Sequence, residues 1–103
     1  MKKIGKLVRD KIPETIESEG RKPITRTLLK DEFLAELDKK FSEELAEFIE
    51  EHEIVELGDV LEIIYAYCDL LGVSFEDLEK IRSEKASKNG DFSKRIYLEG
   101  TEE

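Results

Sequence analysis

The stretch of sequence that decides the fold is residues 31–71, DEFLAELDKKFSEELAEFIEEHEIVELGDVLEIIYAYCDLL. Apolar side chains recur along it at steps of three and four residues, which is the spacing of one stripe on an α-helix. The pattern therefore predicts two amphipathic helices, and Gly72 is the expected C-terminal cap of the second. The two stripes are Leu34, Leu37, Phe41, Leu45 and Phe48, and then Leu57, Val60, Ile64, Tyr67 and Leu71.

The polar segment Glu50-Glu51-His52-Glu53 separates the two stripes and decides how the helices are arranged. A chain reversal between Phe48 and Ile54 would make them an antiparallel hairpin. The segment contains neither glycine nor proline, so its turn signal is weak. One continuous helix in a coiled coil is the alternative, and it would separate Glu44 from Glu56 by about 18 Å.

The flanking segments predict shorter elements. Pro13 suits the first turn of a short helix that Gly20 ends, and residues 21–27 are expected to be extended or loop. Ser74 is the expected cap of a third helix that closes at Asn89-Gly90. Residues 95–98 have the pattern of one short strand. The fold class is therefore all-α, a helical hairpin plus a third helix with a short extended C-terminal segment. It forms a single domain with an arm (1–29), a helical core (31–88) and a tail (90–103).

Composition narrows the classes of function. The chain has 103 residues, with 17 basic against 26 acidic residues and a formal net charge of −9, which repels a nucleic-acid polymer. The only cysteine, Cys68, excludes an internal disulfide and is expected to be a small buried hydrophobe. The most apolar stretch, 60–71, contains Glu62 and Asp69 and is too short and charged to span a membrane. No apolar run follows the basic N-terminus, so we expect no signal peptide and a cytoplasmic location.

Several carboxylates fall on faces that should be buried. At about 100° per residue, Glu56 lies within the apolar arc of the second helix and Asp59 on its edge. Glu44 lies in the first stripe, Glu47 is one step further round, and Glu43 points more outward. An unpaired buried carboxylate is costly, and too few basic residues share these stripes to neutralise it. A divalent cation such as Mg²⁺ takes oxygen ligands and would neutralise these carboxylates. Ordinary solvation is the alternative, because Glu-rich helices are common.

These acidic residues also carry a resemblance. The pattern Glu43-Glu44-x-x-Glu47, followed by Glu56-x-x-Asp59, resembles the all-α nucleoside triphosphate pyrophosphohydrolases, the MazG-like and phosphoribosyl-ATP pyrophosphohydrolase-like proteins. The string KLVRDKIPE at residues 6–14 resembles the opening of a small subgroup of that family. The segment Lys85-x-x-x-Asn89-Gly90-x-Phe92, with Arg95-Ile96 after it, resembles that subgroup's terminal motif. Asn89 and Asp91 depart from the Arg-Gly-Gly-Phe expected there.

The resemblance implies a hydrolase that cleaves a nucleoside triphosphate to the monophosphate and pyrophosphate with Mg²⁺ or Mn²⁺, in house-cleaning of the nucleotide pool. It implies a helical bundle completed by oligomerisation, as a homodimer or homotetramer. The metal ligands would be Glu44, Glu47, Glu56 and Asp59, and Glu43 would be a further catalytic acid. The cations available for substrate phosphates are Lys6, Arg9, Lys40, Lys85 and Arg95.

Two alternatives belong to other classes of function. One is a non-catalytic helical interaction or regulatory module, which would account for the amphipathic helices and the acidity. The other is a nucleotide- or metal-binding protein that has lost turnover, given Asn89 and Asp91. No motif in the sequence indicates which nucleotide would be cleaved.

Overall fold

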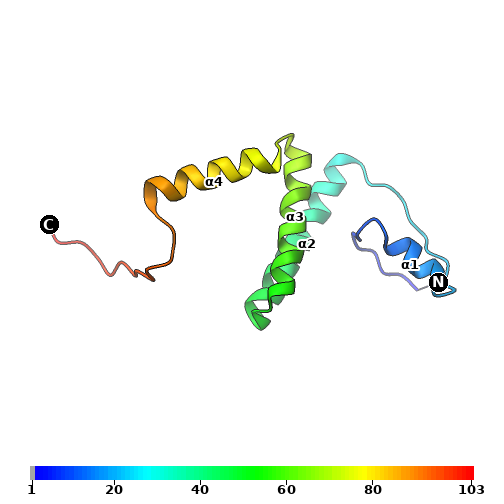
Figure 1. Cartoon of the computed structure of the whole chain (residues 1–103). Helices are drawn as coiled ribbons and strands as arrows, with labels where there is room; N and C mark the ends of the chain where they lie inside the picture. The colour runs from blue at the N-terminus through cyan, green and yellow to red at the C-terminus, as the bar shows by residue number, and fades with distance from the viewer. Residues whose placement is uncertain (1) are drawn as a thin grey trace. The chain divides into compact units, whose positions relative to one another are not determined.

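Residues 2–103 are described in a computed structural model, and in this range four α-helices and their connections form without a β-strand. The helices are α1 (Ile12–Ser18), α2 (Lys30–Glu51), α3 (Ile54–Leu71) and α4 (Phe75–Asn89), as Figure 1 shows. The all-α prediction is thus confirmed. The chain divides into two compact units, one that ends at Tyr67 and one that comprises Cys68–Glu103.

Helices α2 and α3 form the predicted antiparallel hairpin, and the chain reverses at His52 and Glu53 (Figure 1). The turn needs no glycine because His52 itself adopts the left-handed conformation, with φ 55°. The backbone N–H of His52 donates to the carbonyl of Phe48 at 2.7 Å, and the two rings lie edge to face with centroids 5.3 Å apart. The continuous-helix alternative is therefore excluded.

A thin core holds the hairpin together. Leu37 on α2 and Val60 and Ile63 on α3 are buried. The hydroxyl of Tyr67 donates to Asp38 Oδ1 at 2.6 Å, and its ring packs edge-on against Phe41 at 5.4 Å between centroids. The predicted apolar stripes are only partly covered, because many of the large apolar side chains of α2 and α3 are exposed. They include Leu34, Leu45, Ile49, Ile54, Val55, Leu57 and Leu61.

The N-terminal part of this unit follows its sequence signals. Helix α1 contains Pro13 in its first turn, and Gly20 with φ 81° follows its end. Residues 21–27 form no helix or strand, as predicted. Arg26 pairs with Glu32 at 2.8 Å, and the Glu32 carboxylate also accepts from the backbone N–H of Leu29 at 3.2 Å. Glu32 therefore caps the start of α2.

In the second unit, the start and end of α4 confirm the predicted signals. Ser74 Oγ accepts from the backbone N–H of Asp77 at 3.1 Å, and Gly90 with φ 86° follows the last turn. Cys68 is buried, as predicted. The short strand expected at residues 95–98 does not form within residues 2–103. Arg95 has φ 54°, which is not an extended conformation, and no other strand forms in residues 2–103 for this segment to pair with.

None of the helices in residues 2–103 combines the length and apolarity needed to traverse a bilayer. The 18 residues of α3 are interrupted by acidic side chains. These are Glu56, Asp59, Glu62 and Asp69.

Candidate functional site

The hairpin brings three of the predicted metal ligands close enough to influence one another. Glu44 and Glu47 extend from α2, and Asp59 extends from α3. The Glu44 side chain is only 14 % exposed, and burial is the largest cause that raises its pKa. The negative charges of Glu47 and then of Asp59 raise that pKa further. The charged form of Glu44 is therefore less favoured than that of a free glutamate.

Two further α2 residues act on Glu44. Lys40, one helical turn before it, places Nζ 3.8 Å from Glu44 Oε1 and lowers the pKa of Glu44, whereas the charge of Glu43 raises it. The net result of all these influences is a raised pKa, so one lysine does not compensate for burial and three carboxylates. We call Glu43, Glu44, Glu47 and Asp59 the acidic cluster.

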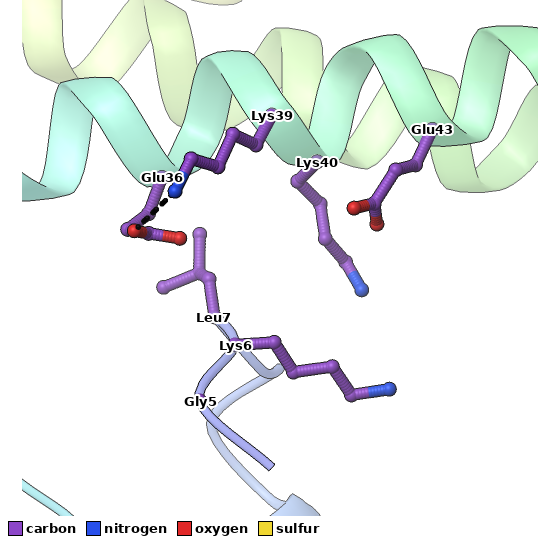
Figure 2. A pocket seen from close by; sticks show the side chains of 7 residues that line it. All are labelled: Gly5, Lys6, Leu7, Glu36, Lys39, Lys40 and Glu43. Atoms are coloured by element: carbon purple, nitrogen blue, oxygen red, sulfur yellow. Dashed lines mark hydrogen bonds and ion pairs between the residues drawn. The ribbon is translucent and has the colours of Figure 1, made fainter.

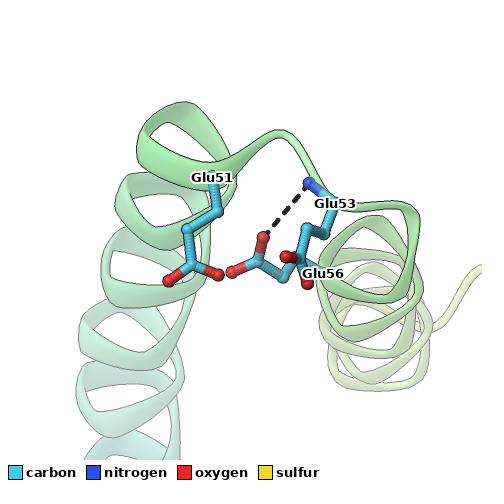
Figure 3. Close-up of side chains that lie close together, drawn as sticks. All are labelled: Glu51, Glu53 and Glu56. Carbon is cyan, nitrogen blue, oxygen red and sulfur yellow. Dashed lines mark hydrogen bonds between the residues drawn. The ribbon is translucent and has the colours of Figure 1, made fainter.

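Glu56 takes part in a different group at the hairpin turn. It is only 6 % exposed, and its Oε1 accepts from the backbone N–H of Glu53 at 3.3 Å. Figure 3 shows its carboxylate between those of Glu51 and Glu53, and ligand oxygens of the three lie within 4.8 Å of one another. Within residues 2–103, the acidic cluster and Glu56 together form no group this tight.

The surroundings of Glu56 explain why a carboxylate is tolerated there without metal. Burial raises its pKa most, the hydrogen bond from Glu53 lowers it, and a hydrogen bond with Glu51 raises it. The backbone N–H of Glu53, at the start of α3, thus offsets part of the cost of burying this carboxylate. Helical projection alone missed this explanation. The spacing Glu53-x-x-Glu56 at a helix start is the signal that indicates a cap.

Asp59 already has a basic partner from the N-terminal part of the chain. The guanidinium of Arg9 lies 2.8 Å from Asp59 Oδ1, and the two side chains are 56 % and 41 % exposed. An ion pair this exposed contributes about 0–1 kcal/mol. The expectation that too few basic residues are available to neutralise the carboxylates is therefore wrong for Asp59. That expectation counted only basic residues on the same helical stripes, whereas Arg9 lies near the N-terminus.

A small pocket lies beside the acidic cluster, where the N-terminal segment approaches α2. Figure 2 shows the ammonium groups of Lys6 and Lys40 and the carboxylate of Glu43 at this pocket. A neighbouring lysine, Lys39, pairs with Glu36 at 3.2 Å. The pocket encloses about 80 Å³ and is lined by Gly5, Lys6, Leu7, Glu36, Lys39, Lys40 and Glu43. Three predicted cations, Lys6, Arg9 and Lys40, thus belong to the same unit as the acidic cluster.

The other two predicted cations belong to the second unit. Lys85 is exposed on α4, which has no buried residue, so it does not lie on the buried side expected from its stripe. Arg95 is also exposed and follows α4. Asp91 accepts from the backbone N–H of Ser93 at 2.9 Å, and this hydrogen bond lowers its pKa.

The donor set of the acidic cluster fits a hard divalent cation. It consists of carboxylate oxygens, the ligands that Mg²⁺ prefers. It also includes a largely buried carboxylate, Glu44, whose pKa is raised by burial and by the charges of Glu47 and Asp59. The tighter group of Glu51, Glu53 and Glu56 does not by itself indicate a bound metal. Glu51 and Glu53 are exposed, and the Glu56 carboxylate already accepts a hydrogen bond from the backbone N–H of Glu53.

Comparison with known proteins identifies no family. No family model matches the chain, and no solved structure matches it. An uncharacterised protein of Mycolicibacterium smegmatis is 54 % identical over 44 residues, which are 43 % of this chain and 45 % of that protein. The chain thus spans less than half the length of this relative.

Proposed function

We propose that this chain is a nucleoside triphosphate pyrophosphohydrolase that uses Mg²⁺ or Mn²⁺ bound by the acidic cluster. The observation that carries the proposal is the largely buried Glu44 carboxylate, whose pKa is raised by burial and by Glu47 and Asp59 on the two helices. A divalent cation at this point would favour the charged form of all three. The resemblance of the acidic motifs to the all-α pyrophosphohydrolases supports the same reading.

Each side chain has a role in this proposal. Glu44, Glu47 and Asp59 hold the metal, and Glu56 joins them only if it leaves the backbone N–H of Glu53. A divalent cation held there would neutralise the charge of the polyphosphate and would lower the pKa of a water molecule. Glu43 would orient the attacking water.

Cations at the edge of the cluster complete the proposed site. Lys6, Arg9 and Lys40 bind the oxygens of the polyphosphate, so catalysis rests mainly on positioning and electrostatics. Lys85 and Arg95, in the second unit, are further proposed contacts to substrate. In the same proposal the protein is cytoplasmic and acts as a homodimer or homotetramer. The exposed apolar side chains of α2 and α3 support this assembly, since burial against another subunit would remove them from water.

The decisive experiment measures pyrophosphate release from standard and modified nucleoside triphosphates, with Mg²⁺ and with a chelator. We expect release that requires the metal and that falls by orders of magnitude in Glu44→Gln. The matched control is Glu62→Gln, which changes an exposed carboxylate of α3 and should retain activity. If no nucleotide yields pyrophosphate, or if the chelator has no effect, the proposal is wrong.

A second candidate function is a non-catalytic helical interaction module. The exposed apolar side chains of the hairpin favour it as much as they favour self-association. In that case the Glu44→Gln variant would keep its binding partner, and no nucleotide would be hydrolysed. The pyrophosphate assay therefore separates the two candidates.

A further inference from the structure

Residues 2–11, the first part of the N-terminal segment, meet the hairpin at the acidic cluster. From here on, the arm denotes residues 2–11 alone. Within residues 2–103, the ion pair that joins this arm to α3 is Arg9–Asp59, at 2.8 Å. Lys6 and Leu7 of the arm line the pocket beside Lys40 and Glu43. The arm thus lies against residues that the proposed function assigns to metal binding and phosphate binding.

We propose that Arg9 and a divalent cation compete for the Asp59 carboxylate, so that metal binding releases the arm and makes Arg9 available to an anionic substrate. This inference rests on the proposed function, because it takes Asp59 as a metal ligand. It adds an order of events, in which the metal binds before the nucleotide, and a device that enforces that order.

The competition follows from charge and geometry. The Arg9 guanidinium is held by the negative charge of Asp59, and its NH2 nitrogen lies within hydrogen-bond distance of Oδ1. A divalent cation bound to this carboxylate neutralises the charge that attracts Arg9 and repels the guanidinium directly. Both side chains are about half exposed, so water readily takes the place of the lost partner.

The released side chain suits a polyphosphate. The planar guanidinium presents its donors in a fork that matches two phosphate oxygens at once, which a lysine ammonium does not. Lys6 and Lys40 lie at the adjacent pocket, so Arg9 would add a third cation for the same ligand. Before metal binds, Arg9 is paired with Asp59, and a nucleotide meets a site in which one cation is already engaged.

Limited proteolysis with a lysine-specific endoproteinase tests the release of the arm. The arm offers cleavage after Lys6 and Lys11, and Lys94 in the second unit provides an internal reference. In the wild-type protein, Mg²⁺ should speed cleavage after Lys6 and Lys11 several-fold relative to Lys94. In Arg9→Gln, which retains every lysine, cleavage of the arm should be fast with and without Mg²⁺.

Two control variants separate the ion pair from simpler effects. Arg26→Gln breaks a different exposed ion pair, with Glu32, and should keep the wild-type response to Mg²⁺. In calorimetric titration, Arg9→Gln should bind Mg²⁺ several-fold more tightly than the wild type. Lys6→Gln removes the same charge from the arm without removing a partner of Asp59, and should change the affinity less.

The outcomes distinguish this inference from the proposed function. If Mg²⁺ binds and pyrophosphate is released, but Mg²⁺ leaves cleavage of the arm unchanged or slows it, Arg9 stays on Asp59 and only the competition is refuted. An equal gain in Mg²⁺ affinity for Arg9→Gln and Lys6→Gln would also refute it, because general charge would then be the cause. If Mg²⁺ does not bind at all, both proposals are wrong.

Discussion

At the scale of single residues, the carboxylates that share the apolar faces have different physical situations. Glu44 is largely buried and surrounded by other acids, with Lys40 as its cationic neighbour. Glu56 is more deeply buried, but it accepts a hydrogen bond from the backbone at a helix start. Asp59 is half-buried and paired with Arg9. Of the three, Glu44 is the residue whose pKa is raised by burial and then by the charges of Glu47 on α2 and Asp59 on α3.

The raised pKa of Glu44 predicts a pH dependence in the absence of metal. Because its pKa lies above the ordinary 4.5, the folded protein takes up this proton at a higher pH than the unfolded chain. The contribution of Glu44 to stability therefore rises as the pH falls from neutrality through the raised value toward 4.5. With a chelator present, Glu44→Gln should have a higher Tm than the wild type at neutral pH. This advantage should shrink as the pH falls from neutrality toward 4.5, and a constant difference would contradict the assignment.

Substitution of Glu56 separates its charge from its capping role. Glu56→Gln keeps an oxygen that accepts from the backbone N–H of Glu53, and it removes a buried charge. We expect thermal unfolding without metal to show an equal or higher Tm, whereas Glu56→Ala, which loses the cap, should lower it. Turnover should be lost in both variants if Glu56 joins the metal ligands. A Tm lowered equally by both substitutions would show that the charge itself stabilises the turn.

At the scale of elements, the turn between α2 and α3 decides which acidic residues meet. His52 adopts a positive φ of 55°, which costs a residue with a Cβ roughly 1–2 kcal/mol. Its ring contact with Phe48 offsets part of that cost. The reversal is therefore achieved by a residue that is not a usual turn former, which explains why the turn was only weakly signalled.

Two substitutions at His52 test this balance. His52→Ala loses the ring contact and keeps the strained φ, whereas His52→Gly loses the contact and removes the strain. We expect the glycine variant to be more stable than the alanine variant by about 1 kcal/mol. Urea unfolding at constant m-value would measure the difference. Equal stability of the two variants would show that the turn relaxes away from the left-handed conformation.

The contact between Tyr67 and Asp38 predicts a second pH dependence. Burial and this hydrogen bond raise the pKa of Tyr67 from 10 to about 12. The stabilisation is therefore complete below pH 10 and is lost as the pH rises toward 12. Tyr67→Phe keeps the ring packing against Phe41 and should cost about 0.5–1.5 kcal/mol near neutral pH. The difference in unfolding free energy should disappear in strong base, and a difference that persists there would have another origin.

At the scale of the whole molecule, the chain exposes more apolar surface than its thin core covers. The buried apolar side chains in residues 2–103 are Leu37, Val60, Ile63 and Cys68, and most large apolar residues of α2 and α3 remain accessible. A chain of this length gains limited burial alone. This imbalance is the physical ground for the proposed self-association.

Sedimentation velocity tests self-association in two variants, in which a lysine replaces one exposed apolar residue or one exposed polar residue of α2. Ile49→Lys places a charge on an exposed apolar site of α2, and should shift an oligomer toward monomer. Ser42→Lys adds the same charge at an exposed polar position of the same helix and should leave the sedimentation coefficient unchanged. A wild-type chain that sediments as a monomer at all concentrations would rule out the homo-oligomer.

The sequence by itself determined the helical stripes and the helix ends away from the turn at His52, because apolar periodicity, Pro13, Gly72 and the Ser74 cap are local signals. It also placed Glu56 on a buried face and Glu44 near one. The tertiary structure decided which side chains meet. The pairing of Arg9 with Asp59 joins residues that are 50 positions apart, and no helical stripe connects them. The turn at His52 set Glu56 beside Glu51 and Glu53, because a reversal in the chain brings together carboxylates from both of its sides.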